Sequence, residues 1–239
     1  MHNSLDTCDR YIAFFDIIGF KNKILEKKHE EIVDLLCNFF SSISDPKQYK
    51  LTGFFDQKSI SCEVKYAFFS DSILIISKDS SDLSNLAISY ASIHVLTIAL
   101  LYSIPIKGAI ACGKMTADFS KSLFVGKPLI DAYLLQEDQN WFGVINHHTA
   151  DRAFFPKVFP DEKINPNYIS LTEEYLVPFK SGKAKHTTYN WPFFSFLGHE
   201  RIIELINCLK FESSGINRIF IENTFDYLNY VTDKYPIIP

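Results

Sequence analysis

The chain has 239 residues, of which 47% are hydrophobic and 22% are charged, with a formal net charge of -4 and a pI near 6.0. This length is enough for one good-sized core, and no linker rich in Pro, Gly or Ser divides it. The acidic balance argues against a general nucleic-acid binder, because such proteins carry a basic stripe on one face.

The cysteines and the apolar stretches indicate the compartment. The five cysteines are scattered and odd in number, and they include no CxxC spacing, which favours buried thiols in a reducing compartment over disulfides or a zinc site. The N-terminus carries no apolar signal region, and polar residues interrupt the longest apolar stretch, residues 86–106. We therefore expect a cytoplasmic protein without a membrane span.

The elements of the first half follow from hydrophobic periodicity. Residues 11–17 are β-formers ahead of Gly19 and predict a central strand, and apolar residues at helical spacing predict an amphipathic helix over 22–40. Residues 62–69 and 73–77 are typical of a hairpin with its turn at residues 70–72. The next predicted elements are a helix over 84–102, a strand over 106–112, an irregular stretch over 115–122, a helix that begins near Lys127 or Pro128, and a strand over 143–146.

The C-terminal part of the chain is harder to assign. A proline-rich segment with Pro156, Pro160 and Pro166 gives no clear element, and two helices are predicted over 200–211 and 216–230. The order βαββαβ followed by αβ predicts an α+β fold with a ferredoxin-like core, in which helices pack on an antiparallel sheet. We expect residues 1–150 to form this core and residues 151–239 to form an extension that packs on it within the same domain.

Two aspartates carry the chemistry in this pattern. Asp16 ends the first strand and Asp71 lies in the hairpin turn, so one sheet can bring both carboxylates to a shared divalent cation. By the two-residue period of a strand, Phe14 faces the same side as Asp16 and forms a neighbouring wall. The amides around Gly19, which precede the helix, can cradle a phosphate. The alternative for each aspartate is an ordinary capping or turn role.

Other polar residues give weaker signals. Lys107 can bring a positive charge to a phosphate or can be a solvated lysine at a strand edge. His147 and His148 are adjacent and diverge, so they do not chelate one metal. The GKP at residues 126–128 lacks the glycine and the hydroxyl residue that a phosphate loop requires. The last of these signals is a small basic segment that we expect to be solvated: Lys180, Lys183, Lys185 and His186.

Four segments resemble the class III nucleotidyl cyclases. Residues 14–20, FFDIIGF, resemble the first metal-binding strand of that family, and residues 70–72 resemble its hairpin turn with the second metal aspartate. Residues 106–113 are similar to the following strand with its basic residue, and residues 126–136 are similar to the helix that carries the transition-state residues. The resemblance covers about residues 10–146 in the correct order.

The departures from the family pattern point to one branch. Ile130 and Leu134 stand where the family has an asparagine and an arginine, and Ala67 replaces the lysine that commonly reads a purine. These losses, together with residues 132–136 and 139–143, resemble the bacterial Pycsar cyclases, which make cyclic CMP or cyclic UMP as an anti-phage signal.

The resemblance implies a reaction and a set of site residues. CTP or UTP would be converted to the 3′,5′-cyclic nucleotide and pyrophosphate, with two Mg²⁺ or Mn²⁺ ions held by Asp16, Asp71 and the carbonyl of Ile17. The substrate-binding residues that we expect are Phe14, Ile18, Gly19, Phe20, Tyr66 and Lys107.

The resemblance also implies partners, and it leaves alternatives. We expect a homodimer with composite active sites and a separate effector that binds the cyclic nucleotide, without nucleic acid or membrane as a partner. A cyclase-like domain that binds nucleotide without turnover, acting as a sensor, is the second hypothesis. A conventional adenylate cyclase is the third.

Overall fold

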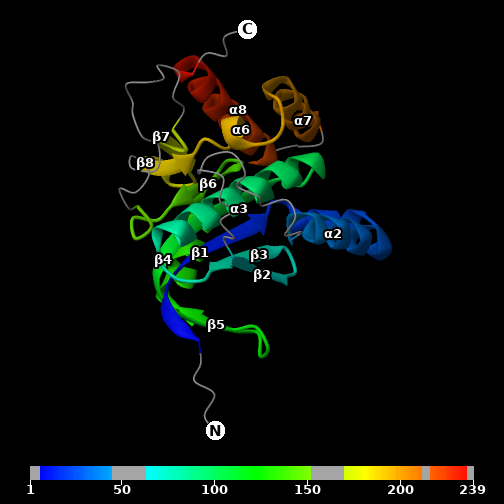
Figure 1. Cartoon of the computed structure of the whole chain (residues 1–239). Helices are drawn as coiled ribbons and strands as arrows, with labels where there is room; N and C mark the ends of the chain where they lie inside the picture. Colours follow the sequence, from blue (N-terminus) through cyan, green and yellow to red (C-terminus); the bar gives the residue numbers. More distant parts are fainter. Residues whose placement is uncertain (1–5, 45–62, 152–169, 212–215, 236–239) are drawn as a thin grey trace.

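The computed structural model describes residues 6–44, 63–151, 170–211 and 216–235 (Figure 1). The proline-rich segment expected to resist assignment lies outside these residues, as does Cys62.

One mixed sheet organises the fold (Figure 1). Its strand order is β2-β3-β1-β4-β6-β8-β7, and a short strand β5 pairs with β4 outside this path. The pairs of β1 with β3 and with β4 are antiparallel, whereas β6 runs parallel to β4. The strands are β1 Thr7–Ile17, β2 Val64–Phe69, β3 Ser72–Ser77, β4 Ile106–Asp118, β5 Leu123–Gly126, β6 Gly143–Asn146, β7 Thr172–Phe179 and β8 Gly182–Tyr189.

The central strand β1 has two different faces. Tyr11, Ala13 and Phe15 belong to the main core, which also contains most of helix α3, Asp82–Leu101. Ile12 and Phe14 alternate with them and belong to a smaller cluster, which Leu129 of helix α4, Lys127–Asp138, joins. Asp16 continues this second series at the end of the strand, so the alternation predicted from the sequence places its carboxylate on the side of α4.

The helix expected over residues 22–40 is two helices. Helix α1 spans Phe20–Glu26 and helix α2 spans His29–Ser44, and the chain is extended at the C-cap of α1, Lys27. Helix α3 begins at the N-cap Ser81, whose side chain accepts a hydrogen bond from the Ser84 amide. Among the described residues, α3 is the one helix long and apolar enough to cross a membrane, and 83% of its most apolar window is buried inside the protein.

The stretch expected to be irregular, residues 115–122, is strand in its first half and turn in its second half. Strand β4 continues to Asp118, and a turn leads into β5, which pairs back on β4. Helix α4, Lys127–Asp138, follows directly and carries Pro128 in its first turn, as predicted. Because of this order, α4 crosses back over β4 and β1 toward the end of the sheet that holds Asp16.

The C-terminal part adds to the sheet. The structure has a hairpin, β7 and β8, that the sequence did not reveal, and β8 pairs with β6. The predicted pair of C-terminal helices is confirmed as α7, His199–Phe211, and α8, Ile216–Lys234, after the short helix α6, Trp191–Phe194. Residues 170–211 and 216–235 therefore extend the sheet and core that begin with β1.

Candidate functional site

The structure brings Asp16 and Asp71 to one end of the sheet. Asp16 pairs in register with Ser72, the first residue of β3, and Asp71 lies in the turn that precedes it. The amide of Ile17 donates a hydrogen bond of 3.1 Å to the backbone oxygen of Asp71. Two residues 55 positions apart in the chain are thus fixed side by side by the pairing of β1 with β3.

The Asp16 carboxylate is electrostatically unfavourable where it lies. Burial raises its pKa from 3.8 to about 6, with a further contribution from the negative charge of Asp71, while Lys107 opposes the shift. No hydrogen bond from another described residue reaches this carboxylate. A desolvated carboxylate beside a second acid is stabilised by a cation, so the pair fits a divalent metal.

The two aspartates suit a magnesium ion that also binds water and phosphate, and they do not form a metal site whose ligands all come from the protein. Among the residues that the structure describes, no three His, Cys, Asp or Glu side chains gather to hold a metal ion. Magnesium is usually bound through one or two carboxylates together with waters and substrate phosphates. Asp16 and Asp71 would supply those carboxylates, and the carbonyl of Ile17 is the further ligand expected from the sequence.

Lys107 lies inside the protein. Lys107 on β4 pairs in register with Asp16 on β1. Lys107 is only 7% exposed, which excludes the alternative that it is a solvated lysine at a strand edge. Its Nζ donates to the backbone oxygens of Glu137 at 2.8 Å and Gln139 at 3.3 Å, at the C-terminal end of α4. Burial and the nearby Lys180 lower the pKa of Lys107 to about 8. The ammonium group therefore ties α4 to β4 beside the two aspartates.

Lys180 is exposed, as predicted for the basic segment, but its positive charge also acts on the candidate site. It lies in the tight turn between β7 and β8, and its charge acts on both Asp16 and Lys107. The Lys180 amide donates to the Asp138 backbone oxygen at 2.8 Å, and the Ser181 hydroxyl donates to the Asp138 carboxylate at 3.0 Å. The signal in the sequence was the pair Lys180–Ser181 before Gly182, but it has meaning only once β7 and β8 are recognised as a hairpin.

The two aromatic residues expected to form one wall lie on different faces of the sheet. Phe14 shares the face of Asp16 and meets the ring of Tyr133 on α4 edge to face, with the ring centroids 5.5 Å apart. Tyr66 pairs in register with Ile75 and packs on the main core. Tyr66 therefore does not join Phe14, whereas Tyr133, which was not predicted, does.

The segment after Asp16 is partly engaged by the fold. Gly19 adopts a left-handed conformation with a φ of 71° and begins α1, which suits a glycine. The Ile18 amide donates to the backbone oxygen of Pro105 at 2.8 Å, so it is not free to bind a phosphate. The amides of Gly19 and Phe20 remain as candidates.

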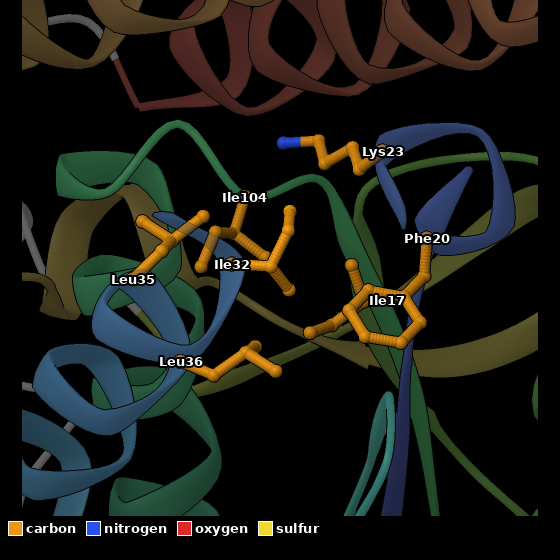
Figure 2. Close-up of a pocket in the computed structure, with 7 residues that line it drawn as sticks. All are labelled: Ile17, Phe20, Lys23, Ile32, Leu35, Leu36 and Ile104. Carbon is orange, nitrogen blue, oxygen red and sulfur yellow. The ribbon is translucent and has the colours of Figure 1, made fainter. Parts of the chain in front are cut away.

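A small pocket lies behind this end of β1 (Figure 2). Its one charged lining residue, Lys23, donates through Nζ to the backbone oxygen of Ser103 at 3.1 Å. The apolar lining residues are Ile17, Phe20, Ile32, Leu35, Leu36 and Ile104. Since the Ile17 side chain points to the face opposite Asp16, this apolar pocket is separate from the two carboxylates and does not suit a triphosphate.

Helix α4 presents apolar residues where the cyclase resemblance expects polar ones. Ile130 and Leu134 are exposed, and Tyr133 between them is partly exposed. On another side of α4, Asp131 binds the Lys127 ammonium at 2.6 Å and lies 4.0 Å from His147. That ion pair lies at the N-terminal end of α4, far along the helix from the contacts of Lys107.

Comparison with known proteins establishes the fold. Neither a protein-family model nor a curated protein matches this chain. Among solved structures, the chain is similar to the catalytic core of a rhodopsin-guanylyl cyclase with converted specificity, solved in complex with ATPαS, with a TM-score of 0.52 and 12% identity. The similarity covers 78% of this chain and 96% of that core. The chain has the α+β fold of a nucleotidyl cyclase catalytic core, as predicted.

Proposed function

We propose that this protein is a nucleotide cyclase that converts CTP or UTP to the 3′,5′-cyclic nucleotide and pyrophosphate. The observation that carries the proposal is that Asp16, at the end of β1, and Asp71, in the neighbouring turn, lie together in a cyclase fold, and that no described residue donates a hydrogen bond to the Asp16 carboxylate. The similar guanylyl cyclase core was solved with a nucleoside triphosphate analogue, which supports a triphosphate as the substrate class.

The reaction forms one bond and breaks one bond. The ribose 3′ oxygen attacks the α-phosphorus, the bond from that phosphorus to the bridging oxygen of the β-phosphate breaks, and pyrophosphate and a proton leave. Asp16, Asp71 and the Ile17 carbonyl would hold the two Mg²⁺ or Mn²⁺ ions, which supply charge neutralisation and lower the pKa of the 3′ hydroxyl.

The remaining residues orient the substrate. Lys107 and Lys180 place two positive charges beside the carboxylates, and these charges offset part of the negative charge of the phosphates. The amides of Gly19 and Phe20 would bind phosphate oxygens at the turn into α1. Phe14 forms an apolar wall on the same face.

Pyrimidine specificity and the biological role belong to the proposal as well. Ala67, Ile130 and Leu134 replace the residues with which class III cyclases commonly read a purine and contact ribose and phosphate, as in the Pycsar branch. By this resemblance the product is an anti-phage signal that a separate effector binds in the cytoplasm.

We also propose a homodimer with composite active sites. Helix α4 and strand β5 carry neighbouring exposed apolar side chains, and such a surface favours association with another protein surface. The side chains are Leu123, Val125, Ile130, Tyr133 and Leu134.

A second candidate function is nucleotide sensing without turnover. The exposed apolar residues Ile130 and Leu134 favour it, since they cannot donate hydrogen bonds to ribose or phosphate. The presence of both Asp16 and Asp71 at one place favours catalysis, because a sensor has no need to keep both metal carboxylates.

One experiment separates these functions. The protein is incubated with a mixture of ATP, GTP, CTP and UTP and Mn²⁺, and the products are identified by mass spectrometry. We expect cyclic CMP or cyclic UMP with pyrophosphate, and no product from Asp71→Ala. Asp34→Ala, which removes an exposed aspartate on α2, is the matched control and should keep wild-type activity.

Each other result has a definite meaning. Cyclic AMP alone would identify a conventional adenylate cyclase. Bound nucleotide without a cyclic product would identify the sensor. Wild-type turnover in Asp71→Ala would refute the metal assignment.

A further inference from the structure

Phe69 is the most exposed large apolar side chain among the described residues, at 82% exposure. It is the last residue of β2 and lies two positions before Asp71. Exposure of an aromatic ring does not stabilise the fold, because burial of its apolar surface is favourable. Its position beside the two carboxylates indicates a ligand or a partner.

The sheet register places Phe69 on the same face as the candidate metal ligands. Phe69 pairs with Ser72, and Ser72 pairs with Asp16. Directly paired residues of antiparallel strands point to the same face. Phe69 and Asp16 are therefore two strand spacings apart, which is about 10 Å.

The surface between Phe69 and β1 is apolar and partly open. The next row of the same face contains Ala67, Leu74 and Phe14, which pair with one another across β2, β3 and β1. These three residues belong to the smaller hydrophobic cluster. Ala67 carries only a methyl group and is partly buried in this cluster, whereas Phe69 in the next row is open.

The other aromatic residues near this row are already packed. Phe14 is engaged edge to face by Tyr133. Phe68 points to the opposite face, where its ring stacks on Phe40 with centroids 4.3 Å apart. The ring of Phe69 contacts no other aromatic ring among the described residues, so its flat face is open to a ligand.

We propose that the nucleobase of the substrate stacks on Phe69 while its phosphates lie at Asp16 and Asp71. This inference rests on the proposed function and adds to it the residue that holds the base. Stacking tolerates any base, so Phe69 supplies affinity and orientation and does not select the base.

The test measures binding of the base separately from binding of the phosphates. We compare 3′-deoxy-UTP and 3′-deoxy-CTP, which cannot cyclise, with inorganic tripolyphosphate, each titrated calorimetrically in the presence of Mn²⁺. Phe69→Leu keeps an apolar side chain but removes the aromatic face. We expect this substitution to lower the affinity for the two nucleotides about tenfold and to leave the affinity for tripolyphosphate unchanged.

Two further variants are the controls. Phe69→Trp keeps an aromatic face and should bind the nucleotides as wild type does. Phe196→Leu changes another exposed phenylalanine, which lies near His94 of α3 on the other side of the sheet, and should have no effect.

Four results would overturn the proposal. Equal nucleotide affinity in wild type and Phe69→Leu would remove the stacking role. Equal weakening of nucleotide and tripolyphosphate would indicate disturbed phosphate binding. A change of oligomeric state in Phe69→Leu, measured by analytical ultracentrifugation, would assign Phe69 to a protein interface. Wild-type protein that binds neither ligand would refute the proposed function itself, and this inference with it.

Discussion

Two carboxylates in this protein, one buried and one partly buried, differ in the groups that surround them. Glu173 of β7 is 6% exposed and accepts hydrogen bonds from the Lys234 ammonium, the Tyr235 hydroxyl and the Asn190 side-chain amide. Asp16 of β1 is partly buried, receives no hydrogen bond from a described residue, and lies beside Asp71.

The difference teaches how to separate a structural acid from a functional one. Donors that surround Glu173 satisfy its charge inside the fold and tie the end of α8 to β7. Asp16 has a raised pKa because the fold provides burial and a second negative charge in place of donors. A site of this kind costs stability and is completed by a cation from outside.

Asp16→Asn should have the largest effect. We expect cyclase activity to fall at least about a thousandfold, because an amide is a poor ligand for a hard cation. The melting temperature should stay the same or rise, because the change removes a desolvated charge. Activity assays and calorimetry on the same preparation measure both quantities. Activity within tenfold of the wild-type value would contradict the assignment of Asp16 as a functional acid.

Glu173→Ala should show the opposite pattern. The change leaves the Tyr235 and Asn190 groups without their acceptor, so the free energy of unfolding should fall by about 2 kcal/mol. Turnover per folded molecule should stay at the wild-type value. Urea denaturation measures the stability, and Tyr235→Phe, which removes one donor, should give a smaller loss. A loss of turnover without a loss of stability would contradict the structural role.

The pH dependence of stability should reveal the raised pKa of Asp16. The usual pKa of this carboxyl group, which applies to the unfolded chain, is 3.8, and its pKa in the folded protein is about 6. At a pH between these two values the folded state therefore retains a proton that the unfolded state has released. The contribution of Asp16 to stability therefore decreases as the pH rises through this window and is constant above it. We expect the free energy of unfolding to fall by about 1 kcal/mol across this window, since partial exposure screens the charge. Denaturation of metal-free wild type and Asp16→Asn across this range tests it, and equal slopes would contradict it.

Lys180→Ala should have the smallest effect. The side chain lies on a turn and acts on Asp16 through its charge, so folding stability should not change. The KM for the triphosphate should rise about threefold at low salt and less at high salt, because mobile ions screen exposed charges. Lys183→Ala, on the same hairpin, is the control. An equal effect of both changes would indicate a general charge effect of the hairpin.

Several parts of this structure could be predicted from the sequence. The alternation along β1 placed Asp16 and Phe14 on one face, and the short polar turn placed Asp71 between β2 and β3. The helix–strand order of residues 10–146 predicted the fold class. These features depend on local periodicity and on turn residues, which act over a few positions of the chain.

Other parts could not be predicted in this way. The β7–β8 hairpin has polar, exposed residues over half of β8, so it lacks the apolar alternation that signals a strand. Lys180 could not be recognised without this hairpin. Tyr66 is an aromatic residue of the kind that can line a binding site, but its register with Ile75 places its side chain on the other face of the sheet.

The sequence by itself determined which residue types are present for metal chemistry, the order of the main strands and helices of the first half, and the place of the turn that holds Asp71, because these depend on neighbours in the chain. The tertiary structure alone decided that no described residue donates a hydrogen bond to the Asp16 carboxylate, that Lys107 is buried against the end of α4, and that Phe69 is exposed near the two aspartates. Burial, pKa and register arise from contacts between residues far apart in the chain, and a linear pattern contains no measure of those contacts.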